Sequence, residues 1–194
     1  MAKKRKIKIM VASTVYQNRD LLLQICGILN TYGYHVINSE YGTLHPPLGM
    51  NNTDACIAAV AECDIFFGII NPMYSTGITH LEFQRAIAID KPRRFIAHSF
   101  VIFSRKLLAQ YMYDDAAKTP RNDFEIQSTS VMDSVKVIDM YNDAVQINLA
   151  YEERKYHWVQ EFFRPDEALR HVETLFRDIK RVERELANLN NPAQ

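Results

Sequence analysis

The sequence predicts an α/β protein with a doubly wound parallel sheet of four to five strands and a mainly helical C-terminal elaboration. In the first half of the chain, short apolar, β-prone runs alternate with segments whose apolar residues recur at helical spacing. Strands joined by single helices pair in parallel through right-handed crossovers. Charge is sparse there, with ten charged side chains between Ile7 and Asp90, as a sheet covered on both faces requires.

The elements of the first half follow one another in regular order. We expect strands at residues 7–12, 34–39, 65–70 and 94–97, and helices at residues 21–32, 52–61 and 79–89. Gly33 stands where a helix would end with a left-handed residue, and Pro92 stops the last of these helices.

The second half is less regular and more charged. We expect helices near 103–113 and 131–145, a strand at 158–163, and one last helix that begins at Pro165. The apolar residues of this helix form one stripe: Leu169, Val172, Phe176, Ile179, Val182 and Leu186. This stripe packs either on the sheet of the same chain or against another molecule. We divide the chain into a core, 1–113, and an elaboration, 114–194, which together form one structural domain.

Composition excludes several classes of protein. The 194 residues carry 23 basic and 23 acidic side chains, and this neutrality argues against nucleic-acid binding, which needs a basic surface. No apolar run approaches the roughly 20 residues that span a membrane, and the basic start lacks a cleavage site. We therefore expect a soluble cytoplasmic protein.

Cysteines and histidines suggest no metal site. Cys26, Cys56 and Cys63 are odd in number and form no C-x-x-C pair, so we interpret them as small buried hydrophobic residues. The six histidines show no ligand spacing. We expect no metal and no required cofactor.

A ligand site is expected at the carboxyl ends of the strands, where doubly wound sheets bind their ligands. Neither G-x-G-x-x-G nor the P-loop pattern occurs, which argues against ordinary dinucleotide-dependent dehydrogenases and P-loop NTPases. The polar candidates for substrate binding follow the first and third strands or begin the next helix: Ser13, Thr14, Tyr16, Asn71, Tyr74, Ser75, Gly77 and His80.

Glu82 is the candidate catalytic residue, and its position in the sequence can be interpreted in two ways. Thr79 and Glu82 have the spacing of a capping box, in which both side chains bond backbone N–H groups at the start of a helix. Alternatively, Glu82 points into the ligand crevice, where the helix dipole would hold its carboxylate ionised. The two readings are compatible.

Three segments carry a resemblance to known families: 7–14, CDIFFGIINPMYSTG and ITHLEFQRAIAIDKP. They resemble a bacterial family of TIR-like domains of uncharacterised function, and the later VIDMYNDAVQ and WVQEFF stretches extend this resemblance over most of the chain. More distantly, over residues 7–99, they resemble nucleoside deoxyribosyltransferases. Gly77, Glu82, Ala86 and Lys91-Pro92 match the motif of those enzymes. The resemblance implies a flavodoxin-like or TIR-like fold.

The motif also departs from both families. Ser75 stands where the deoxyribosyltransferases carry an acidic residue, and the interval from Gly77 to Glu82 is one residue longer. His80 stands where the TIR-like family often has a second Glu.

The resemblance implies cleavage of an N-glycosidic bond in NAD or a related nucleotide or nucleoside, with Glu82 as the catalytic carboxylate. No acid motif accompanies Glu82, which favours NAD, because nicotinamide leaves a cationic ring without needing a proton. The alternative is a non-enzymatic module in signalling or defence. It would bind a nucleotide or assemble into a homo-oligomer through the C-terminal helices.

Overall fold

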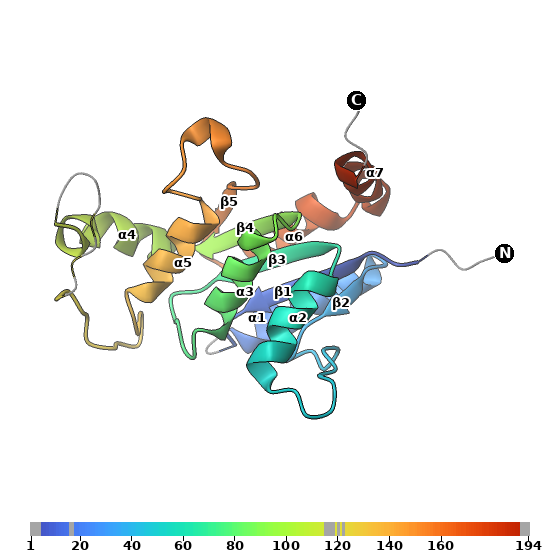
Figure 1. The fold of residues 1–194 in the computed structure, drawn as a ribbon, viewed down its shortest axis with the longest axis horizontal. Coiled ribbons are helices and arrows are strands. Elements are labelled where there is room, and N and C mark those ends of the chain that lie inside the picture. Colours follow the sequence, from blue (N-terminus) through green and yellow to red (C-terminus); the bar gives the residue numbers. More distant parts are fainter. Residues whose placement is uncertain (1–4, 16–17, 115–118, 120, 122, 191–194) are drawn as a thin grey trace.

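The computed structural model describes residues 5–15, 18–114, 119, 121 and 123–190, and it contains one parallel sheet (Figure 1). The strand order is β2-β1-β3-β4-β5, and every neighbouring pair is parallel. The strands are β1 (Lys8–Ser13), β2 (His35–Ile37), β3 (Ile65–Ile70), β4 (Arg93–His98) and β5 (Val159–Phe162). This is the doubly wound, flavodoxin-like order, as predicted, and the expected strand near residue 160 is its fifth strand.

Helices cover both faces of the sheet. On one face lie α1 (Arg19–Thr31), α6 (Pro165–Phe176) and α7 (Ile179–Asn190). On the other lie α2 (Asn52–Glu62), α3 (Ile78–Ala88), α4 (Ser99–Met112) and α5 (Lys136–Ala144). Figure 1 shows α2, α3 and α5 in front of the strands and α1 behind them. A short 3₁₀ helix (Tyr151–Glu153) precedes β5.

Two-sided burial explains the composition of the central strand. All six residues of β3 are buried. Alternate side chains enter opposite cores, because successive residues of a strand face opposite sides: Phe67 and Ile69 pack with α1 and α6, whereas Phe66 and Ile70 pack with α3 and α5. A strand buried on both faces must be apolar throughout, which is why the IFFGII run could be predicted.

Gly68 in β3 makes room for two aromatic rings, those of Phe83 and Phe95. The rings of Phe83 and Phe95 stack with centroids 4.9 Å apart, and Phe66 meets Phe83 edge-on at 5.4 Å. A Cβ atom at residue 68 would lie 2.3 Å from Phe83 and 2.7 Å from Phe95. Glycine is therefore required by packing of α3 against the sheet.

The C-terminal segment differs from the prediction in one respect. Instead of one helix, α6 ends at Phe176 and α7 begins at Ile179. Asp178 starts the second helix, because its carboxylate accepts a hydrogen bond from the backbone N–H of Arg181 at 3.0 Å. The apolar stripe nevertheless continues across the break into the core of this chain, where Phe176 and Val182 are buried. No helix in the described ranges is long and apolar enough to cross a membrane.

We predict that Gly68→Ala destabilises the protein by about 1–3 kcal/mol, because the new methyl group overpacks the Phe83 and Phe95 rings. Denaturant unfolding measures the change. Gly27→Ala in α1 is the matched control, since nothing lies within 4 Å of its Cβ position, and we expect it to stabilise by about 0.5–1 kcal/mol. Equal stability of the Gly68 variant and the native protein would contradict this packing.

Candidate functional site

A cavity of about 650 Å³ lies at the carboxyl ends of the strands. Its walls come from the end of β1, the loop after β2, the N-terminal half of α2, the loop after β3 and the start of α3. The lining side chains are apolar residues, hydroxyls, amides, one thiol and one carboxyl group: Met10, Val11, Ala12, Ser13, Thr14, Val15, Asn38, Ser39, Leu44, Pro46, Asn52, Cys56, Ser75, Thr76, Ile78, Thr79 and Glu82.

The strand order places the cavity there. The connection from β1 leads to β2 on one side, and the connection from β2 returns across to β3 on the other side of β1. Such a reversal separates the loops that leave the strands and opens a crevice between them. The cavity therefore lies at the position that the sequence predicts for a ligand.

Glu82 lines this cavity from the second turn of α3, which begins one residue earlier than expected. Gly77 is the N-cap residue, in a left-handed conformation with φ of 78°, and the helix starts at Ile78. Thr79 is then the second helical residue and Glu82 the fifth, so the predicted capping box is wrong. The Glu82 side chain, which is 6% exposed, instead lines the cavity beside Thr79.

Burial changes the charge state of Glu82. Desolvation raises the pKa of its carboxyl group from 4.5 to about 7, although a hydrogen bond with the Cys56 thiol lowers it. The expectation that the helix dipole holds this group ionised is therefore wrong. The dipole acts within the first turn, and Glu82 lies beyond it. Near neutral pH the site holds both the acid and its carboxylate.

Cys56 is the neighbour of Glu82 on the facing helix α2. Burial and the nearby carboxylate raise the pKa of this thiol to about 12, so it stays protonated and acts as a hydrogen-bond donor. The cysteine is buried, as expected, but it also lines the cavity. The prediction that Cys56 is only a small buried hydrophobic residue is therefore incomplete.

Ser13 and Thr14 line the cavity at the end of β1. The amide of Asn71, after β3, lies behind them and donates to the Ser13 hydroxyl at 2.9 Å. Among the described residues, the buried Thr14 hydroxyl has no protein hydrogen-bond partner. Asn71 therefore fixes the wall, and Thr14 is left with hydrogen-bonding capacity.

The loop after β3 is fixed by a residue from the second half of the chain. Asp133 accepts hydrogen bonds from the backbone N–H groups of Tyr74, at 2.6 Å, and Ser75, at 2.8 Å. Ser75 is thereby held in a left-handed conformation, φ 57°, at the wall of the cavity. The Tyr74 ring packs over Gly77, where a Cβ atom would lie 2.9 Å from it. Gly77 is therefore needed for the conformation of this loop, and it does not line the cavity.

Tyr74 and His80 turn away from the cavity and form a network with α5. The Tyr74 hydroxyl lies 2.9 Å from His80 Nδ1, and His80 Nε2 lies 2.8 Å from an Asp143 carboxylate oxygen. Burial raises the pKa of Asp143, but hydrogen bonds from His80 and Gln84 outweigh it and hold the pKa below its usual range. This network connects α3 to α5, and neither Tyr74 nor His80 lines the cavity.

Sequence reasoning missed the wall that follows β2. That strand ends at Ile37 instead of at residue 39, so Asn38 and Ser39 lie at its carboxyl end and line the cavity. The Asn38 side chain donates a hydrogen bond to the Val11 carbonyl oxygen and accepts one from the Tyr41 backbone N–H, each at 2.8 Å. The rule that ligands bind at the carboxyl ends of the strands also selects Asn38 and Ser39, if β2 is taken to end at Ile37. The candidate Tyr16 lies outside the described residues.

The cavity is chemically simple. Glu82 is the one carboxyl group among its described lining residues, which include no Lys, Arg or His. Within the described ranges, no three His, Cys, Asp or Glu residues are grouped so that they could hold a metal ion. The site can therefore bind a hydroxyl-bearing molecule and place one titratable carboxyl group against it.

Comparison with known proteins gives two matches. The family model DUF4062, a domain of unknown function, matches residues 8–175. Among solved structures, the crystal structure of a conserved protein from Enterococcus faecalis V583 is similar, at 13% identity and a TM-score of 0.40. The similarity covers 88% of this chain and 99% of the other. No curated protein matches the chain.

We predict that Glu82→Gln stabilises the protein in a pH-dependent manner. The folded pKa of about 7 exceeds the ordinary 4.5, so the folded state binds more protons between these values and native stability falls as pH rises through them. The gap corresponds to about 3 kcal/mol. Relative to the native protein, the variant should gain roughly that amount between about pH 4 and pH 8.

Denaturant unfolding across this pH range measures the difference. Glu62→Gln, at an exposed position of α2, is the control and should follow the native curve at every pH. A Glu82→Gln variant whose advantage does not change with pH would show that Glu82 titrates normally.

Proposed function

This chain belongs to the DUF4062 family, and we propose that it cleaves the N-glycosidic bond of NAD or a related nucleotide or nucleoside, with Glu82 as the catalytic carboxylate. One observation carries the proposal. The Glu82 carboxyl group is buried, has a raised pKa, and lines the cavity at the reversal point of the sheet. Perturbed titratable groups in such clefts are typical of catalytic sites.

The chemistry of the reaction suits this arrangement. Departure of the base leaves an oxocarbenium-like sugar, and an ionised carboxylate beside the anomeric carbon stabilises that positive charge or attacks it. Glu82 lies among neutral groups that neither compete for its charge nor screen it. Water then completes hydrolysis, and a second acceptor in place of water gives transfer.

The walls suit a sugar. Ser13, Thr14, Ser75 and Asn38 line the cavity, and hydroxyl and amide groups of this kind bind ribose hydroxyls as donors and acceptors. Thr14 has hydrogen-bonding capacity that the described protein groups do not use. Asn71, Tyr74, Gly77 and His80 support these walls.

The sequence resemblance to TIR-like domains and to deoxyribosyltransferases supports the same reaction, because Glu82 occupies the position of their Glu. One feature favours a binding module instead. The described lining residues provide no second carboxylate or histidine to activate water or protonate a leaving base. A module of this kind would bind the nucleotide in the same cavity without turnover.

The test is incubation of the purified protein with NAD and a panel of nucleosides and nucleotides, with products identified by mass. We expect release of nicotinamide or free base, reduced about 10²- to 10³-fold in Glu82→Gln and unchanged in Glu62→Gln. Undiminished release by the Glu82 variant would contradict the catalytic assignment. Ligand-dependent thermal stabilisation without any product would establish the binding module.

The pH dependence of kcat/KM indicates the leaving group. Because nicotinamide leaves a cationic ring unaided, its release needs the Glu82 carboxylate and should rise with pH through about 7. A neutral base leaves more easily when protonated, so its release by the acid form of Glu82 should fall above the same pH. A rate that does not change around pH 7 would contradict control by Glu82.

A further inference from the structure

The outward face of α4 carries an apolar stripe. Phe100, Phe103, Leu107 and Tyr111 recur at intervals of three and four residues, so they lie along one side of the helix. They are 39%, 63%, 55% and 47% exposed. Scattered exposed apolar residues are ordinary on protein surfaces, but a continuous row along one helix marks an interaction surface.

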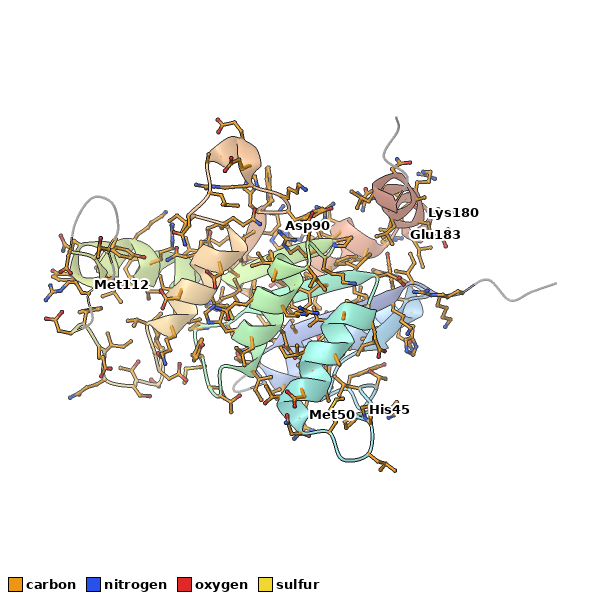
Figure 2. All side chains as sticks on the ribbon, in the orientation of Figure 1. His45, Met50, Asp90, Met112, Lys180 and Glu183 are labelled. Atoms are coloured by element: carbon orange, nitrogen blue, oxygen red, sulfur yellow. The ribbon has the colours of Figure 1, made fainter. Side chains whose placement is uncertain are left out.

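The opposite side of α4 is apolar as well. Val101 and Met112 are buried against the sheet and α5, with Ile102 and Leu108 packed beside them. Polar residues such as Ser104, Lys106 and Gln110 lie between the two apolar sides, and an apolar side of a helix is normally buried against a partner. In this structure α4 lies at the edge of the molecule, with Met112 near its end (Figure 2), and it is covered on one side.

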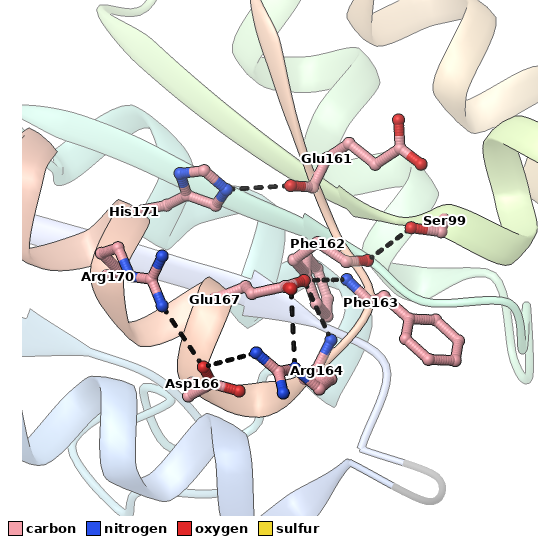
Figure 3. Close-up of polar contacts among 9 residues, drawn as sticks. All are labelled: Ser99, Glu161, Phe162, Phe163, Arg164, Asp166, Glu167, Arg170 and His171. Atoms are coloured by element: carbon pink, nitrogen blue, oxygen red, sulfur yellow. Dashed lines mark hydrogen bonds and ion pairs between the residues drawn. The ribbon is translucent and has the colours of Figure 1, made fainter.

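One further ring extends the stripe at its N-terminal end. Phe163, just after β5, is 55% exposed, and its ring centroid lies 5.7 Å from that of Phe100. The start of α4 is attached to this segment, because the Ser99 hydroxyl donates to the Phe162 carbonyl oxygen at 3.2 Å (Figure 3). The four stripe residues and Phe163 together form what we call the α4 face.

We propose that the α4 face binds the same face of a second copy of this chain, forming a two-fold symmetric dimer. At roughly 150–250 Å² for each aromatic side chain, the observed exposures leave about 500 Å² of apolar surface on one copy. Two such faces bury about 1,000 Å², which is the lower size limit of a specific interface. A two-fold dimer uses one patch twice, so this chain alone supplies the required area.

The net charge of the chain does not oppose this pairing. The five residues of the α4 face are uncharged, the exposed Lys106 flanks them, and the Arg105 side chain donates to the Asn142 amide oxygen at 2.6 Å. The chain has zero formal net charge, so two copies approach without long-range repulsion. The dimer does not use the C-terminal stripe that the sequence suggested, because Phe176 and Val182 are already in the core of the chain.

The experiment measures the mass of the full chain by sedimentation and light scattering from about 1 to 200 µM, a range suited to a small interface. We expect a dimer for the native protein and a monomer for Phe103→Glu/Leu107→Glu, with Kd raised at least 100-fold. Leu48→Glu is the control and should remain dimeric. This fully exposed leucine lies between His45 and Met50, far from α4 (Figure 2).

Hydrogen exchange on the native protein gives a second measurement that needs no variant to fold. The α4 amides should exchange more slowly at the high concentration than at the low one. A native protein that stays monomeric, or a folded double variant that stays dimeric, would overturn the proposal. So would a monomer that binds phosphatidylcholine vesicles through α4, which would make the face a lipid contact. The dimer is independent of the reaction proposed for Glu82.

Discussion

A parallel sheet has to be covered on both faces, and this constraint shapes the molecule from the composition of β3 to the position of Glu82. Every residue of β3 is buried, so helices must reach both sides of it. The chain achieves this by winding from β1 outward to β2 and then back across to β3. That reversal separates the loops at the carboxyl edge, and the cavity is the space between them.

The same arrangement buries a carboxyl group that would be more stable in water. Glu82 enters the cavity from the second turn of α3, and Cys56 is the neighbour that lowers its pKa against the larger effect of burial. The fold keeps the group at a cost in stability when it ionises. Residues that lower the stability of a fold in this way are typical of functional sites.

The second half of the chain supports the site without entering it. Asp133 fixes the backbone of Tyr74 and Ser75, and Asp143 fixes His80. These contacts explain why two predicted site residues turned out to support the wall. Their types suggested chemistry, but in the structure Tyr74 and His80 are occupied with each other and with α5.

Periodicity and the strand-end rule predicted much of this structure. They identified the strands and the doubly wound sheet, and they selected Ser13, Thr14, Ser75 and Glu82 for one edge. They could not place Cys56, because its role depends on the packing of α2 against α3, far from any local pattern.

Local ambiguity explains the other errors. The start of α3 depends on the left-handed Gly77, whereas the Thr79 spacing suggested a later start. Asn38 was expected inside a strand, but β2 ends at Ile37, so Asn38 lies in the loop at the carboxyl end. Periodicity does not predict the outward stripe of α4, because it does not tell which side of a helix meets the core.

The pKa of Glu82 is the quantity on which the account of the site depends most directly. It can be measured by ¹³C NMR of a protein labelled at the Glu carboxyl carbons, with the Glu82 signal assigned from its loss in Glu82→Gln. A titration midpoint near 7 is the predicted result. A midpoint near the ordinary 4.5 would contradict it, because Glu82 would then be solvated and the cavity would hold no tuned carboxyl group.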